Sequence, residues 1–289
     1  MTNNNITIGF IGLGAMGFQM ARNLAENGIK TAGFDKNPER MNLLKGTKIV
    51  PGNGVENLIE ECEVLMTSLP SSKIFVDVAK NSILKNGRKG QVLIDVGTVE
   101  PSECRKLAGM FAEKGMTLID APVTGGEGGA ASGNLGIFLG GDKEAINKYM
   151  YVFEAIGDPG KIVYCGESGS GQIVKGVNQM AMGLGTAAYL ESVFYGVSLG
   201  IDAKILMDAV GGDSGWRSVF KEIAKAVAVG EGYKMGVKHG QLQYFISEAQ
   251  NEGHDLPISQ ALYEYLKNSE CTIKEANRMS PSFWNELEK

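Results

Sequence analysis

A glycine-rich turn between an apolar run and a helical pattern constrains the fold of this chain more than any other feature. Residues 6–13 form an apolar run too short for a core helix, which predicts a buried parallel strand. The turn that follows has the spacing G-x-G-x-x-G and consists of Gly12, Leu13, Gly14, Ala15, Met16 and Gly17. Asp35 comes 23 residues after Gly12, at the end of a second expected strand at 31–35. This context favours a dinucleotide-binding site over a tight turn without a ligand.

Each part of this motif has a physical role. Glycines allow the backbone to approach a pyrophosphate, whose charge is stabilised by the unpaired N–H groups that open the helix. The carboxylate of Asp35 can accept hydrogen bonds from ribose hydroxyls and would repel a 2′-phosphate. The motif therefore favours NAD, while the neighbouring cation of Lys36 leaves NADP open.

Apolar runs and helical patterns alternate along the first part of the chain. A helix is expected after the glycine turn, with Met16, Met20, Ala21 and Leu24 at helical spacing and a stop at Gly28. Further strands are expected at 64–69, 92–96, 117–121, 137–139 and 161–164, and helices at 38–44, 55–62, 72–84 and 101–114. Such alternation predicts a doubly wound α/β domain with a parallel sheet covered on both faces.

The pattern becomes entirely helical after Gly166. Helices are expected at 170–199, 203–210, 216–228, 235–252 and 258–269, with a last short one after Pro281. We therefore expect a Rossmann domain at 1–165 and an all-α domain at 166–289, joined through the long helix. Glu191 is the only charged residue between 176 and 201, but polar residues and glycines make this segment a poor membrane span. A helix this apolar is expected to be buried between protein surfaces, which indicates a homo-oligomer.

Composition excludes several classes of function. The 28 basic and 33 acidic residues give a net charge of −5 without a basic tract, so we expect no nucleic-acid or anionic membrane partner. The four cysteines lie far apart, which suits a reducing compartment. Residues 1–5 lack the positive charge of a secretory signal, so a cytoplasmic location is expected. With only two histidines and no metal-spaced cluster, we expect no metal, and zinc-assisted alcohol oxidation and Ser-His-Asp hydrolysis are unsupported.

Ligands of open α/β sheets bind at the carboxyl ends of the strands, which directs attention to three segments. Leu69-Pro70 and Gly97-Thr98 each follow an expected strand, and a glycine-rich stretch at 120–141 follows another. Within it, Thr124 beside Gly125 and Gly126 offers free N–H groups that could hold a carboxylate. The alternative is an ordinary surface loop.

Lys175 is the candidate general acid. It lies early in the long, almost uncharged helix and one turn before Asn178, so both side chains share a face. Beside an oxidised nicotinamide and in a low dielectric, its pKa is expected to fall toward neutrality, as catalytic proton transfer requires. The alternative is a lysine that reaches solvent or pairs with a carboxylate.

Several segments resemble the β-hydroxyacid dehydrogenase family, in particular 3-hydroxyisobutyrate dehydrogenases, over nearly the whole chain. The most specific is DAPVTGGEGGAASGNLGIFLGG at 120–141, with SGNL at 132–135. The others are IGFIGLGAMGFQMARNL (8–24), SLP (68–70), DVGTVEP (95–101), GSGQIVKGVNQM (169–180), and Lys238 followed by Gly253 and Pro257. The resemblance implies a metal-free NAD(P)-dependent enzyme that interconverts a small 3-hydroxy acid and its semialdehyde, and that forms a homodimer or homotetramer.

The resemblance also implies a role for individual residues. Lys175 would act as general acid in reduction and general base in oxidation. The substrate carboxylate would be held by Thr124, Gly125 and Gly126 and oriented by Asn178. The cofactor would be bound by Gly12, Leu13, Gly14, Ala15, Met16 and Gly17 at the pyrophosphate, by Asp35 at the ribose, by Leu69, Pro70 and Thr98 along the path from the adenosine to the nicotinamide, and by Lys238 over the nicotinamide ribose or carboxamide.

Two departures from the family pattern concern the substrate. Thr124 replaces the usual serine, and its methyl group is expected to narrow the pocket, while His239 stands where the family has aspartate. Reductases for glyoxylate, succinic semialdehyde or tartronate semialdehyde share the same catalytic parts and remain alternatives. An imine reductase is disfavoured because Lys175 is retained, and a non-catalytic dinucleotide-binding module is disfavoured by the pair Lys175 and Asn178.

Overall fold

The protein is described here from a computed structural model, which describes residues 7–230, 233 and 237–268. The chain divides into two compact units, Met1–Lys175 and Gly176–Lys289, and the division falls within one long helix. Each unit is presented by itself. The fold class expected from the sequence, an α/β domain followed by an all-helical one, is confirmed.

A nine-stranded sheet forms the centre of the described part of the first unit, in the order β3-β2-β1-β4-β5-β6-β8-β7 with β9 beside β8. The strands are β1 (Thr7–Ile11), β2 (Lys30–Phe34), β3 (Val50–Pro51), β4 (Val64–Thr67), β5 (Val92–Asp95), β6 (Thr117–Asp120), β7 (Val123–Thr124), β8 (Leu135–Gly140) and β9 (Gly157–Gly166). Strands β1 to β6 pair in parallel, as predicted. The expectation of a parallel sheet is wrong for β8, which is antiparallel to β6 and β7. Between β6 and β8 the chain forms only β7 and the short helix α6, whereas a parallel crossover usually contains a longer helix packed on the sheet.

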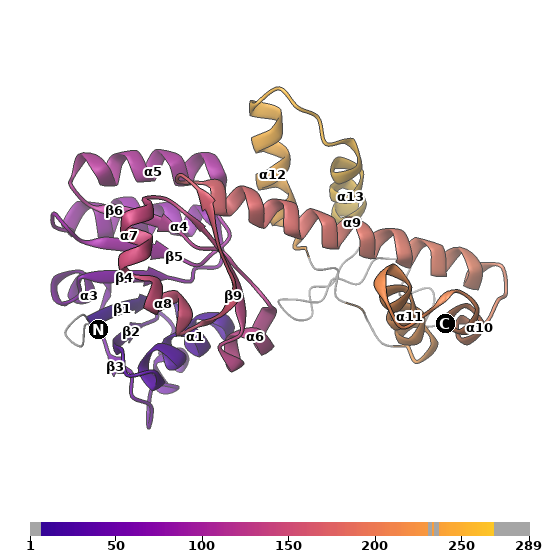
Figure 1. Cartoon of the computed structure of the whole chain (residues 1–289), viewed down its shortest axis with the longest axis horizontal. Coiled ribbons are helices and arrows are strands. Elements are labelled where there is room, and N and C mark those ends of the chain that lie inside the picture. Colours follow the sequence, from indigo (N-terminus) through magenta and orange to yellow (C-terminus); the bar gives the residue numbers. More distant parts are fainter. Residues whose placement is uncertain (1–6, 231–232, 234–236, 269–289) are drawn as a thin grey trace. The chain divides into compact units, whose positions relative to one another are not determined.

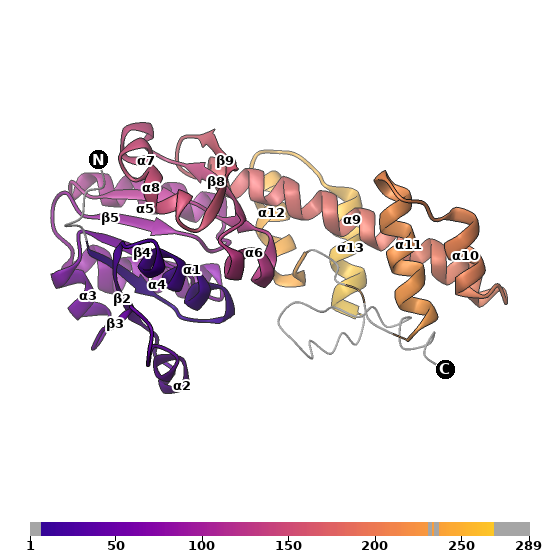
Figure 2. The same ribbon diagram turned by 60° about the horizontal axis from the view of Figure 1, so that its bottom comes forward.

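Helices cover both faces of this sheet (Figures 1 and 2). The helices of this unit are α1 (Ala15–Glu26), α2 (Pro38–Asn42), α3 (Val55–Glu61), α4 (Ser72–Val78) with a π-helical continuation at Ala79–Leu84, α5 (Pro101–Glu113), α6 (Gly126–Ser132), α7 (Lys143–Lys148) and α8 (Met150–Glu154). The short helices α6, α7 and α8 and the two-residue strands β3 and β7 are additions to the predicted pattern. They are too short to leave a periodic signal in the sequence.

Alternate residues of the strands point into two separate cores. Ile8 and Phe10 of β1 pack with α1, α6, α7 and α8 on one face. Ile11 of the same strand and Leu65 of β4 pack with α3, α4 and α5 on the other. This two-sided burial explains why the strands read as continuous apolar runs rather than as alternating ones.

The second unit consists of helices in its described part. They are α9 (Ser170–Ser198), whose first residues belong to the first unit, α10 (Ala203–Val210), α11 (Gly215–Ala228), α12 (His239–Asn251) and α13 (Pro257–Asn268). Leu190 and Val193 of α9 pack with Phe220, Ile223 and Leu242 in a shared core. The helix expected after Pro281 lies outside the described residues. Within the described ranges, no helix combines the length and apolar character needed to cross a membrane.

Candidate active site

The parallel strands end level with one another. Ile11 pairs with Thr67, Thr67 with Asp95, and Asp95 with Asp120, so β1, β4, β5 and β6 finish at one edge of the sheet. The segments that leave this edge are 12–17, 68–70, 97–99 and 121–126. The register therefore brings together the glycine turn, the Leu69-Pro70 and Gly97-Thr98 segments, and the start of the glycine-rich stretch.

The three glycines of the turn differ in what requires them. Gly12 has φ +95°, and a Cβ there would lie 2.4 Å from the carbonyl oxygen of Ser68. A Cβ on Gly17 would lie 2.0 Å from the carbonyl oxygen of Gly12, so these two positions are closed by the fold itself. Around Gly14, in contrast, no atom lies within 4 Å of an added Cβ. A pyrophosphate that approaches the backbone supplies the missing reason for glycine at this position, so the turn fits a dinucleotide.

The carboxylate of Asp35 fixes the glycine turn. Its Oδ2 accepts a hydrogen bond from the Leu13 N–H at 2.7 Å, and its Oδ1 accepts one from the Asn37 N–H at 2.8 Å. The side chain of Leu13 is buried in the core, so Leu13 can face a cofactor only through its backbone. Each carboxylate oxygen keeps a further lone pair. Asp35 therefore keeps the acceptor capacity for a ribose hydroxyl, and its predicted contact with a ribose stays a prediction.

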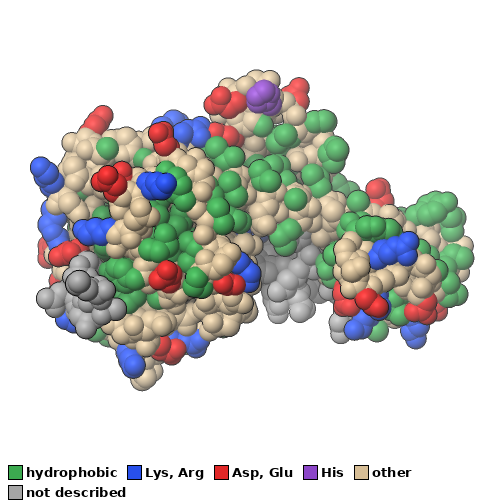
Figure 3. All heavy atoms as spheres, in the orientation of Figure 1, with side chains coloured by type: hydrophobic (Ala, Val, Ile, Leu, Met, Phe, Trp, Pro, Cys, Tyr) green, Lys and Arg blue, Asp and Glu red, His purple; other side chains and the backbone are tan. Residues whose placement is uncertain are grey.

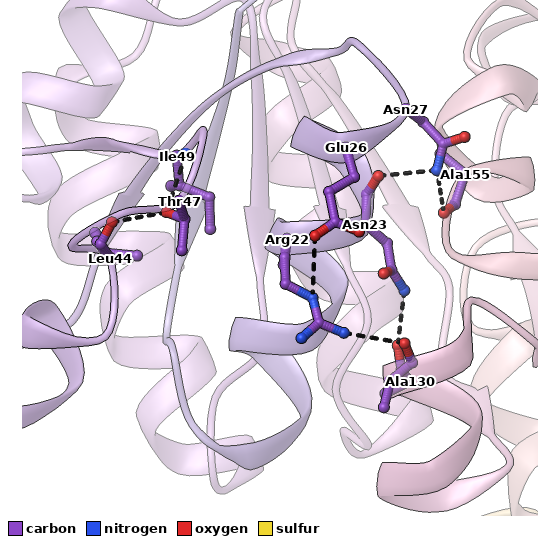
Figure 4. Close-up of polar contacts among 10 residues, drawn as sticks. Arg22, Asn23, Glu26, Asn27, Leu44, Thr47, Ile49, Ala130 and Ala155 are labelled. Carbon is purple, nitrogen blue, oxygen red and sulfur yellow. Dashed lines mark hydrogen bonds and ion pairs between the residues drawn. The ribbon is translucent and has the colours of Figure 1, made fainter.

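The glycine-rich stretch at 120–141 is structured rather than an open loop. Thr124 ends β7, Gly125 and Gly126 have φ of +120° and +63°, and α6 begins at Gly126. Helix α6 is attached to α1, because Asn23 Nδ2 donates to the Ala130 carbonyl at 2.7 Å (Figure 4). Helix α1, which follows the glycine turn, thus also holds in place the helix α6 that begins at the predicted carboxylate-binding segment.

The methyl group of Thr124 faces a glycine on the neighbouring strand. Thr124 pairs with Gly136 of β8, and a Cβ on Gly136 would lie 2.8 Å from Thr124 Cγ2. Gly136 therefore leaves the space that the methyl occupies. The expected narrowing of a substrate pocket by this methyl stays a prediction.

The amine of Lys175 lies next to this segment. Its side chain is buried at 8% exposure, and Nζ donates to the Val123 carbonyl oxygen at 2.7 Å. Val123 immediately precedes Thr124, so the predicted general acid and the start of the predicted carboxylate cradle are brought together within the first unit. The Lys175 side chain therefore does not extend to solvent, which was one of the alternatives.

Three residues of interest belong to the second unit. Asn178 follows Lys175 by one turn of α9, and its Nδ2 lies 3.6 Å from Met182 Sδ. Lys238 is the exposed residue that precedes α12. The ring of His239 stacks on Tyr263 with 4.3 Å between centroids, which gives His239 a packing role that its sequence position did not indicate. The roles of Asn178 and Lys238 stay predictions.

Two buried carboxyl groups at the same strand ends were not among the predicted site residues. Asp95 Oδ1 accepts a hydrogen bond from Thr67 Oγ1 at 2.7 Å, and burial raises the pKa of Asp95 to about 7. Asp120 accepts hydrogen bonds from the N–H groups of Gly169 and Gln172 at 2.8 and 3.2 Å. Burial raises the pKa of Asp120 as well, although these two N–H groups oppose the shift. The sequence feature that could have indicated them is an aspartate at the end of each of the apolar runs at 92–95 and 117–120.

The raised pKa of Asp95 predicts a stability that depends on pH. The unfolded carboxyl ionises near 3.8 and the folded one near 7, so the folded state binds more protons between these values. Unfolding free energy should therefore fall as pH rises through this window and then level off. Asp95→Asn should flatten that fall in thermal melts, whereas Asp158→Asn, at an exposed salt bridge with Lys161, should leave it unchanged. An equally steep fall in Asp95→Asn would contradict the assignment.

Among the described residues, no group of three or more His, Cys, Asp and Glu side chains could hold a metal ion. Cys62, Cys104 and Cys165 are free thiols, and Cys271 lies outside the described residues. Burial raises the pKa of the Cys62 thiol to about 11 and that of Cys104 well above its usual value, so neither suits a nucleophile.

Comparison with known families matches both parts of the chain. Residues 7–166 match the NAD-binding domain of 6-phosphogluconate dehydrogenase, and residues 169–278 match the NAD-binding domain of NADP-dependent 3-hydroxyisobutyrate dehydrogenase. The chain belongs to the 3-hydroxyisobutyrate dehydrogenase family of NAD(P)-dependent enzymes. The resemblance found in the sequence motifs is thereby confirmed.

Individual relatives in this family have different named substrates. A probable mitochondrial 3-hydroxyisobutyrate dehydrogenase of Dictyostelium discoideum is 36% identical over 71% of this chain and 64% of its own length. The chain thus matches just under two thirds of that relative. The 2-(hydroxymethyl)glutarate dehydrogenase of Eubacterium barkeri is 33% identical over 88% of this chain and 86% of its own. A solved 3-hydroxyisobutyrate dehydrogenase of Mycobacterium tuberculosis, with L-serine, shares the fold at a TM-score of 0.80 and 24% identity, covering 98% of both chains.

Proposed function

We propose that this protein interconverts a small 3-hydroxy acid, similar to 3-hydroxyisobutyrate, and its semialdehyde, with NAD or NADP as hydride carrier. The observation that carries this proposal is the 2.7 Å contact between Lys175 Nζ and the Val123 carbonyl. It sets an amine beside Thr124, Gly125 and Gly126, at the edge of the sheet where the glycine turn also lies. A proton-transfer group, an anion cradle and a dinucleotide turn are the parts that such a reaction needs.

Each residue of the proposed site has its own role in substrate binding or proton transfer. The N–H groups at Gly125 and Gly126 and the Thr124 hydroxyl hold the substrate carboxylate, which orients the carbinol carbon two bonds away from the carboxyl carbon. Asn178 binds the same substrate from the next turn of α9. Lys175 Nζ removes the hydroxyl proton during oxidation and returns it during reduction. When bound, the nicotinamide takes up or releases the hydride.

A second candidate substrate is a longer 3-hydroxy diacid. The observation in its favour is the Eubacterium barkeri relative named for 2-(hydroxymethyl)glutarate, which matches more of this chain than the Dictyostelium relative does. Such a substrate has the same hydroxymethyl and carboxylate groups around one carbon, so the roles given above apply unchanged. Reduction of glyoxylate, succinic semialdehyde or tartronate semialdehyde would also use the same groups.

A substrate panel tests the proposal. Formation of NADH and NADPH is measured with 3-hydroxyisobutyrate and 2-(hydroxymethyl)glutarate, and their consumption is measured with glyoxylate and the two semialdehydes. We expect the highest kcat/KM with a 3-hydroxy acid. Turnover confined to glyoxylate would refute the proposed substrate class, and NADH binding without turnover of any compound would indicate a non-catalytic dinucleotide-binding module.

We propose NAD as the preferred cofactor, on the basis of Asp35. Asp35→Ala should raise KM for NAD about tenfold, because the ribose hydroxyls lose a charge-assisted acceptor and the Leu13 N–H loses its partner. Discrimination against NADPH should weaken in the same variant, since a repelling carboxylate is removed. Steady-state kinetics with both cofactors provide the measurement. Lys36→Ala is the control for the opposite possibility, a preference for NADP supported by the neighbouring Lys36 cation. An unchanged KM for NAD in Asp35→Ala would rule out the ribose-binding role of Asp35.

We further propose a homodimer or homotetramer. Figure 3 shows hydrophobic side chains over the helices of the second unit, where the exposed ones include Val177, Met182, Tyr195, Leu199 and Trp216. Exposed apolar side chains in this number favour association. A light-scattering mass equal to one chain would contradict this oligomeric state.

The cytoplasmic location stays a prediction, since the Dictyostelium relative is mitochondrial by name.

A further inference from the structure

Gln172 connects the first turn of α9 to the segment that follows β5. Its side chain is fully buried, with 0% exposure. Oε1 accepts a hydrogen bond from the Val99 N–H at 3.0 Å, and Nε2 donates one to the Gly97 carbonyl at 3.0 Å. One amide group therefore satisfies the backbone on both sides of Thr98, because a carboxamide carries a donor and an acceptor on the same carbon.

The backbone of the same residue is also held. The Gln172 N–H donates to Asp120 Oδ2 at 3.2 Å, and the Gly169 N–H donates to Asp120 Oδ1 at 2.8 Å. Next to it, a Cβ on Gly171 would lie 2.4 Å from the Phe138 carbonyl, so the helix starts in close contact with β8. The start of α9 is therefore fixed against the ends of β5 and β6 by side-chain and backbone contacts together.

Lys175 follows Gln172 by three residues, so the two side chains lie on one face of α9. At its other end, Lys175 contacts Val123. The Gln172 amide thus joins two parts of the proposed site, the Thr98 segment predicted to line the path from the adenosine to the nicotinamide and the helical turn that contains the proton-transfer group. Gly97 and Lys175 are 78 residues apart in sequence, and this bridge links the segments that contain them.

We propose that Gln172 is a positioning residue that sets the distance between the cofactor-lining segment at Thr98 and the amine of Lys175. This rests on the proposed function of that site. Hydride and proton transfer require the reacting groups within a narrow range of distance, and a misplacement of about 1 Å costs on the order of 100-fold in rate. Loss of the bridge should therefore lower kcat well beyond what a comparable loss of stability causes elsewhere in the unit.

Gln91 provides a matched control. It is also a buried glutamine of the first unit, with 2% exposure, and its Nε2 donates to the carbonyls of Ile59 and Cys62 at 2.7 Å each, while Oε1 accepts from the Arg88 N–H at 3.1 Å. Gln91 precedes β5, at the opposite end of the strand from Thr98. Gln172→Leu and Gln91→Leu each remove a buried amide that bridges backbone groups, so both should lower Tm by a similar amount.

The experiment compares kcat, the Kd for NADH by fluorescence, and Tm in the two leucine variants. We expect Gln172→Leu to lower kcat at least tenfold and to raise the Kd for NADH about threefold, with both values unchanged in Gln91→Leu. Gln172→Glu is the conservative variant. Its buried carboxyl stays protonated at low pH, where the O–H can replace the amide donor, and the nearby Asp120 carboxyl disfavours its ionisation further. The ratio of its kcat to that of the wild type should therefore be highest at low pH and fall as pH rises.

Equal losses of kcat in both leucine variants would show a merely structural role and overturn the inference, as would an unchanged kcat in Gln172→Leu. If the wild-type protein turns over no compound of the substrate panel, the proposed function has failed. The Kd for NADH in the two leucine variants then tests the role of Gln172 by itself. A selective rise in Gln172→Leu would then support the bridge to the Thr98 segment, and equal Kd values in the two variants would overturn it.

Discussion

Lys175→Met should lower kcat by about 10²- to 10⁴-fold, the range that a positioned general acid or base contributes. Methionine fills a similar volume, so the helix and its packing persist, but no group remains to move the hydroxyl proton. The Val123 carbonyl also loses its donor, for a stability cost of about 1–3 kcal/mol. Steady-state turnover with the best substrate of the panel measures the effect, and binding of NADH should change little.

The control for Lys175→Met is a second lysine that donates to backbone carbonyls in the same unit. Lys114, which follows α5, has its Nζ 3.0 Å from the Lys85 carbonyl, and it lies before β6 at the other edge of the sheet. Lys114→Met should leave kcat unchanged. If Lys175→Met retained wild-type turnover, the general acid would have to be another residue, and the proposed mechanism would fail.

Gly17→Ala should have the second large effect, on folding and cofactor binding together. The new methyl group would lie 2.0 Å from the Gly12 carbonyl oxygen and 3.1 Å from Ser68 Cβ, so α1 would have to move away from the strand ends. We expect a loss of about 3 kcal/mol or more in unfolding free energy, which is at the upper end of overpacking costs. In a unit of this size this corresponds to a Tm lower by roughly 6–12 °C.

Gly14→Ala should separate the requirement of the cofactor from that of the fold. No protein atom lies within 4 Å of its added Cβ, so Tm should stay within about 2 °C of the wild type. The methyl group would instead occupy the space where a pyrophosphate approaches the turn, and the Kd for NADH should rise about tenfold or more. Gly109→Ala, at an equally open position of α5, should leave Kd unchanged. Normal NADH affinity in Gly14→Ala would show that the turn does not carry the pyrophosphate.

Local patterns were sufficient wherever an element is long and repeats its spacing. The strand at 7–11, the glycine turn, helix α1 and the long helix α9 were predicted within a few residues, because their apolar spacing and breakers lie within the element itself. The reversed direction of β8 and the short helices α6 to α8 were not predicted. Their existence depends on partners that the chain reaches only after folding, such as Asn23 of α1 for the Ala130 carbonyl of α6.

The candidate site divides in the same way. Residue type and local spacing were enough to select Gly12, Gly14 and Gly17, Asp35 and Lys175. The glycines have the spacing of a dinucleotide-binding turn, Asp35 follows Gly12 by 23 residues, and a lysine is unusual in an otherwise uncharged helix. The sequence did not select Gln172, Asp95 or Asp120, since a glutamine in a helix and an aspartate after a strand are common. Only the tertiary structure showed their importance, because it buries them and joins them by hydrogen bonds to groups up to 75 residues away in sequence.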